Sequence, residues 1–68
     1  MRLEILLESP GVEAENVMRD WLAASSLIPA DNNRVEVDPA ECFELLVELR
    51  RRCYDRGVTV DVKFFGNV

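Results

Sequence analysis

Hydrophobic and polar residues alternate in two segments of the chain, Arg2–Glu8 and Val58–Phe65. Alternation with a period of two places the apolar side chains on one face of a β-strand and the polar ones on the other. Both segments are therefore predicted to be strands with one buried face and one wet face. The short segment Arg34–Val37 alternates in the same way and is predicted to be a third strand.

Two longer segments follow the helical period instead. The apolar side of the first, Val12–Ser26, carries Ala14, Val17, Met18, Trp21, Leu22 and Ser25. This spacing is typical of an amphipathic helix. Ser9 is expected to cap that helix and Pro10 to occupy its first turn, where a missing N–H costs nothing.

The second helix carries the stronger end signals. Asp38 is expected to accept a hydrogen bond from the Glu41 amide, in a capping box with Pro39 at the first helical position. Gly57 suits the left-handed residue that follows a helix end. The predicted buried stripe of this helix consists of Cys42, Leu45, Leu46, Leu49 and Cys53.

The order of elements predicts a single compact domain over residues 1–68, in the α/β (α+β) class. We expect a two-layer sandwich in which two helices pack on one face of a three-stranded sheet, because the outer strand faces are charged. The first and third strands are expected to be neighbours, with Arg34–Val37 at an edge. The pattern leaves the direction of that edge strand open, and Pro29–Asn33 has the composition of a turn.

The net charge and the composition disfavour some classes of function. The chain has 13 acids against 8 bases, a net charge of −5. Direct binding to nucleic acid is disfavoured because phosphates attract basic surfaces. The basic run Arg50–Arg52 is expected to pair with Glu48 and Asp55. No apolar run is long enough for a membrane span and the first residues lack a signal-peptide pattern, so a cytoplasmic location is expected.

The residue types that usually carry chemistry are scarce. The chain has no histidine, and its three glycines are isolated, so no phosphate loop or dinucleotide fingerprint exists. Cys42 and Cys53 lie three helical turns apart, too far for a disulfide, and are expected to be reduced core thiols. We therefore expect no enzyme, no cofactor and no metal site.

Two sets of apolar residues are candidates for partner binding. Phe43, Val47 and Tyr54 form a flank beside the buried stripe of the second helix. They either pack on the first helix, against Trp21, or form a partner-binding strip. Leu6 and Phe65, on the outer face of the sheet, are either scattered exposed residues or interface anchors.

Acidic side chains line the exposed sides of both predicted helices. Glu13, Asp20, Glu44 and Glu48 are the candidate charged contacts. They either keep the surface hydrated or meet a basic partner. We expect a small, acidic, non-catalytic protein-binding protein that acts as an adaptor, a subunit or an inhibitor. A phage-type inhibitor that mimics nucleic acid towards a nucleoprotein complex belongs to this class.

The alternative function is a dimeric small-ligand regulatory domain. The expected partner in the first case is a larger protein or nucleoprotein complex with a basic surface. A homodimer is compatible with both functions, because apolar residues flanked by charges are typical of protein interfaces.

Overall fold

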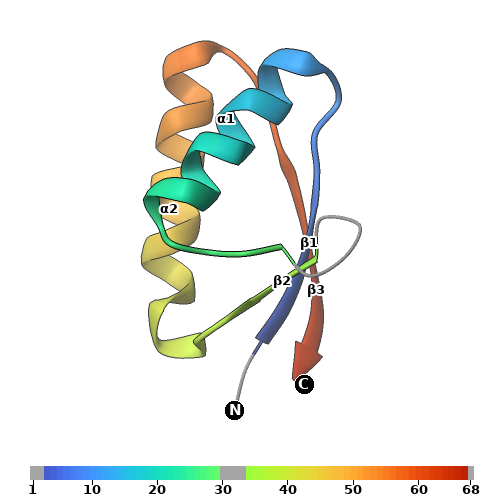
Figure 1. Ribbon diagram of the computed structural model, residues 1–68, viewed down its shortest axis with the longest axis vertical. Helices are drawn as coiled ribbons and strands as arrows, with labels where there is room; N and C mark the ends of the chain where they lie inside the picture. The colour runs from blue at the N-terminus through green and yellow to red at the C-terminus, as the bar shows by residue number, and fades with distance from the viewer. Residues whose placement is uncertain (1–2, 30–33, 68) are drawn as a thin grey trace.

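The computed structural model describes residues 3–29 and 34–67. Its elements are β1 (Leu3–Glu8), α1 (Val12–Ala24), β2 (Arg34–Val37), α2 (Pro39–Arg56) and β3 (Asp61–Asn67). The order β-α-β-α-β and the two-layer arrangement are confirmed, with both helices on one face of the sheet (Figure 1).

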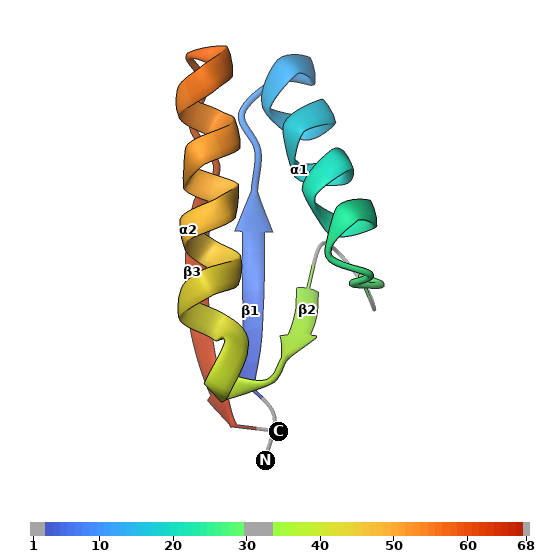
Figure 2. The same ribbon diagram turned by 90° about the vertical axis from the view of Figure 1, so that its left-hand side faces the viewer.

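The sheet has the order β2-β1-β3, so the first strand of the chain is its central strand. β1 pairs with both neighbours in the antiparallel direction, which settles the direction of β2. Leu7 lies opposite Val62 and Ile5 opposite Phe64, and the register shifts between Ile5 and Glu4. Figure 2 shows α2 in front of β3 and α1 on the β2 side of the sheet.

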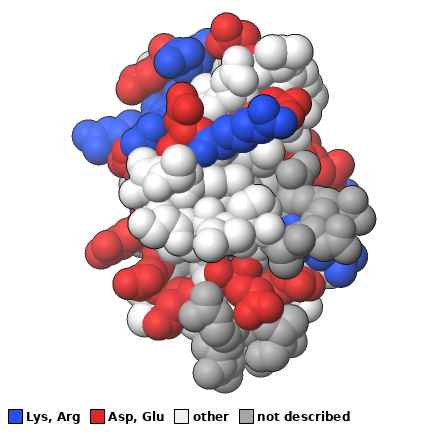
Figure 3. Space-filling view, in the orientation of Figure 1, with Lys and Arg blue, Asp and Glu red and all other residues white. Residues whose placement is uncertain are grey.

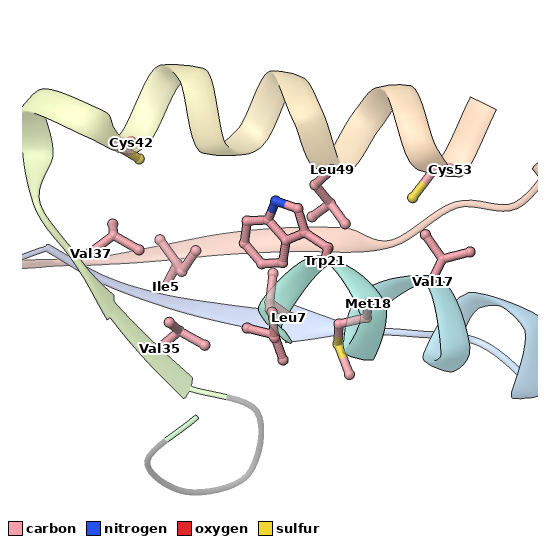
Figure 4. Close-up of a cluster of buried hydrophobic side chains, with 11 residues drawn as sticks. Ile5, Leu7, Val17, Met18, Trp21, Val35, Val37, Cys42, Leu49 and Cys53 are labelled. Atoms are coloured by element: carbon pink, nitrogen blue, oxygen red, sulfur yellow. The ribbon is translucent and has the colours of Figure 1, made fainter. Parts of the chain in front are cut away.

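The core lies between the sheet and the two helices (Figure 4). Its fully buried side chains are Trp21, Ile5, Leu7, Val35 and Val37. The strand residues among them are those that the alternation places on the inner face. Their burial removes large apolar surfaces from water, the main favourable contribution to folding.

The start of α1 differs from the prediction. The helix begins at Val12, its N-cap is Gly11 with φ of 132°, and no side chain caps it. Ser9 and Pro10 lie outside the helix because the chain turns at Gly11, whose backbone conformation side-chain-bearing residues rarely adopt. The helix also ends earlier than predicted, at Ala24, and Ser26 has a left-handed φ of 57°.

The ends of α2 agree more closely with the sequence. The Asp38 carboxylate caps the helix, but it accepts its hydrogen bond from the Ala40 amide at 2.9 Å. The Glu41 amide donates to the Asp38 carbonyl instead, so the predicted side-chain bond between these two residues is wrong. Gly57 is left-handed, with φ of 67°, as predicted.

The last strand begins three residues later than predicted. Val58 is still tied to α2, because its amide donates to the Cys53 carbonyl. Regular pairing with β1 therefore starts only at Asp61, opposite Glu8. Most of the predicted turn before β2, residues 30–33, lies outside the described residues.

Candidate protein-binding surface

One side of α2 is apolar and exposed. Phe43 is 78% exposed, Val47 50% and Tyr54 86%, whereas Cys42, Leu49 and Cys53 on the same helix are buried. Helical residues advance by about 100° each, so these two sets occupy adjacent sectors of one helix. We call the exposed sector, formed by Phe43, Val47, Arg50 and Tyr54, the α2 strip.

The strip does not face α1. The contacts between the helices come from the other side of α2, where the Trp21 indole donates to the Leu45 carbonyl at 2.8 Å. An ion pair of 3.9 Å between Arg56 of α2 and Glu13 of α1 also joins the helices on that side. Packing of the flank against Trp21 is therefore wrong. The helical period gives the width of an apolar arc but not which neighbour lies on each side of it.

A groove runs between the second half of α2 and residues 58–62, which lead into β3 and include its first two residues. It has a volume of about 490 Å³. The residues that line it are Leu46, Leu49, Arg50, Cys53 and Tyr54 from α2, and Val58, Thr59, Val60, Asp61 and Val62 below. β3 is an edge strand, and Phe64 near this edge is 58% exposed. The groove makes the open side of α2 concave as well as apolar.

The sequence alone did not reveal two parts of this surface. The alternation placed Phe64 with the core, but an edge strand leaves one flank of such a residue uncovered. The basic run predicts that Arg50 pairs with acids as its neighbours do, but Arg50 lines the groove and has no ion-pair partner in the described part of the chain. Phe43, Val47, Arg50 and Tyr54 are separated by four, three and four residues, and this helical spacing could have placed Arg50 on the same face as the apolar residues.

Leu6 and Phe65 belong to a different surface, the outer face of the sheet. Leu6 is partly buried and lies opposite Arg34 on one side and Lys63 on the other. Phe65 is 49% exposed, with the Arg34 guanidinium 4.9 Å from its ring centre. This is a cation–π contact that covers part of the ring. The two predicted apolar sets therefore lie on separate surfaces.

The predicted acidic contacts are partly neutralised. Glu48 pairs with Arg51 at 3.5 Å and with Arg52 at 3.3 Å. Glu13 pairs with Arg56, and Asp20 lies in a shallow hollow that arginines also line. The pairing predicted between the arginine run and Glu48 is confirmed for Arg51 and Arg52, whereas Asp55 forms no ion pair with the run among the described residues.

Glu44 differs from these acids because it has no ion-pair partner among the described residues. On the face shown in Figure 3, acidic side chains gather at the end of the molecule where α2 begins. Basic side chains lie mostly towards the opposite end. This face is thus divided between an acidic end and a mixed end.

None of the polar or charged side chains of the described residues is buried, and no group of three His, Cys, Asp or Glu among them is arranged to hold a metal ion. Burial raises the pKa of the Cys42 and Cys53 thiols, and a backbone hydrogen bond with Val60 only partly offsets this for Cys53. A raised pKa makes a thiol less nucleophilic at neutral pH.

Comparisons with known proteins leave this surface to be interpreted from its own geometry. The chain has no significant match to a protein-family model, to a curated protein or to a solved structure. In the described part of the chain, neither helix has the length and apolar character that crossing a membrane requires.

Proposed function

We propose that the protein is a non-catalytic protein-binding domain and that the α2 strip and its groove are its contact surface. The observation that carries this proposal is that Phe43, Val47 and Tyr54 are exposed on a helix whose leucines and cysteines are buried or partly buried. Large aromatic side chains are enriched at the centres of protein interfaces. An apolar set of this size on one helix is a stronger signal than scattered exposed residues.

Charge supports a partner with a basic surface. Glu41 and Glu44 lie in the first half of α2, at the acidic end of the molecule, and neither forms an ion pair within the described chain. Unpaired surface charges of one sign attract the opposite sign and speed encounter. An adaptor, subunit or inhibitor of a nucleoprotein complex fits this requirement, as does any other basic protein.

Site-specific photo-crosslinking tests the contact surface. A benzophenone amino acid replaces Tyr54 in one variant and Ile28, which is 85% exposed on another part of the chain, in the control. In cells of the source organism, we expect discrete crosslinked products from the Tyr54 position and none from the Ile28 position. Equal crosslinking from both positions, or none from either, would contradict the proposal.

The groove supports a second candidate, a small-ligand regulatory domain. Its volume of about 490 Å³ falls within the range of small-molecule sites, and most of its lining is apolar. Ligand binding there would raise the melting temperature of the wild type. The Leu46→Trp variant, which fills the groove, would lose that shift, whereas a screen without any shift would remove this candidate.

A further inference from the structure

The α2 strip has the spacing of a helix that packs against another helix. Phe43, Val47, Arg50 and Tyr54 follow one another at intervals of four, three and four residues. Residues spaced in this way share one face of a helix and form the seam of paired helices. α1 does not occupy this seam, because its contacts with α2 lie on the other side, at Leu45 and Arg56.

The charges beside the strip are divided along the helix. Acids dominate the first half of α2, with Glu41, Glu44 and Glu48, and bases dominate the second half. The basic residues of that half are Arg50, Arg51, Arg52 and Arg56. A helix with this division is complementary to a copy of itself that runs in the opposite direction.

We propose that the α2 strip binds the α2 strip of a second copy of the chain in an antiparallel two-fold pair. This inference rests on the proposed function and names the partner of the strip, because the basic second half of α2 in the second copy supplies the basic surface. With the two-fold axis between Glu48 and Leu49, Phe43 lies level with Tyr54 of the second copy. Each aromatic ring then gains an apolar neighbour.

The same pairing brings the charges together. Glu44 and Arg51 each follow a strip residue by one position, so they lie on the same side of the seam and approach each other across it twice. Glu44 has no ion pair in the described chain, and the pair between Arg51 and Glu48 is exposed and therefore weak. In a parallel pair, Arg50 would instead face Arg50, which like-charge repulsion disfavours.

The helices, and not the sheet edges, mediate this contact. Packed helices lie about 8–10 Å apart, whereas paired strands lie about 4.8 Å apart. Because α2 lies over β3 (Figure 2), two paired α2 helices hold the two β3 edges too far apart for strand pairing. The strip spans about 16 Å along the helix, so the interface is small and a micromolar dimer is expected.

Sedimentation velocity of the purified chain, from about 1 µM to about 1 mM, tests the inference. We expect a concentration-dependent dimer that Tyr54→Glu abolishes and that the control Ile28→Glu leaves unchanged. Glu44→Arg alone and Arg51→Glu alone should each weaken dimerisation about five- to tenfold. The double variant should restore it, because the swapped charges again attract. A monomer at every concentration, or no rescue by the double variant, overturns the inference.

Disulfide trapping tests the direction of the pair. A mixture of Phe43→Cys and Tyr54→Cys chains should form a crosslinked heterodimer, whereas each variant alone should crosslink poorly. Efficient crosslinking of Phe43→Cys with itself would indicate a parallel pair and contradict the inference. If the chain is monomeric but the Tyr54 photo-crosslinker still captures another protein, the pairing of two copies is refuted and the protein-binding function of the strip is not. If both experiments fail, the proposed function fails with it.

Discussion

Trp21 joins α1 to α2 within the core. Its ring is fully buried between the helices and the sheet, and its indole N–H is satisfied by the Leu45 carbonyl of α2 at 2.8 Å (Figure 4). A buried indole requires such a partner, because an unpaired donor costs free energy. It is also the only tryptophan of the chain, so its fluorescence reports directly on the core.

Leu49→Ala is expected to lower the free energy of unfolding by about 2–5 kcal/mol, since it empties a buried site. Leu49 is 2% exposed, whereas Leu46 is only partly buried beside the groove. Leu46→Ala should therefore cost less. Urea unfolding followed by Trp21 fluorescence measures both variants, and equal losses would contradict the observed burial.

The two cysteines are expected to react slowly in the folded protein. Both are free and buried, and burial raises their pKa from the ordinary value of 9.0. Alkylation by iodoacetamide at pH 8 should be about tenfold or more slower than in urea, because little accessible thiolate exists. Mass spectrometry of quenched samples gives the rates, and rapid labelling of the native chain would refute the burial.

The same shift gives a pH dependence of stability. The folded thiols keep their protons at pH values where the unfolded chain loses them, so the folded state binds more protons above about pH 9. The thiols' contribution to stability is complete below that pH and is lost as the pH rises. Urea midpoints measured at pH 8 and pH 10 check the sign, and a higher midpoint at pH 10 would contradict it.

At the scale of elements, the alternation and the helical period predicted the order and type of every strand and helix. The positions of both ends of α2 were also predictable, because Asp38 at its start and Gly57 at its end act through local backbone chemistry. The start of α1 was not, since Ser9 and Pro10 match a cap in composition, whereas the turn at Gly11 determines where the helix begins. The open side of α2 depended on the placement of α1, which is a tertiary property.

The two predicted helix caps give a matched pair of variants. Asp38→Ala should cost about 1 kcal/mol of stability, because the Ala40 amide loses its acceptor. Ser9→Ala should be close to neutral, because no side chain caps α1. Thermal unfolding monitored by circular dichroism compares the two, and a larger effect at Ser9 would show that the cap assignment is wrong.

At the scale of the whole molecule, the exposed α2 strip is separate from the buried interior. The interior holds the inner strand face and the facing sides of both helices. The strip lies outside this interior, so it contributes little to the stability of the isolated chain. Folding and binding by the strip therefore depend on different side chains, whereas Leu49 and Cys53 of the core also line the groove.

Phe43→Ser and Tyr54→Ser are each expected to change the free energy of unfolding by less than about 0.5 kcal/mol, as for other exposed sites. Denaturant unfolding at low concentration, where the chain is monomeric, provides the measurement. The Leu49→Ala variant serves as the destabilised reference. Losses comparable to that reference would show that the strip belongs to the core.

The central position of β1 affects how the chain folds. Its partner β3 is the last strand of this sheet in chain order, and the register joins Leu7 to the distant Val62. Such distant pairing requires the closure of a long loop, which slows folding. During translation, the edge of β1 that pairs with β3 therefore stays unpaired until Asp61–Asn67 has left the ribosome.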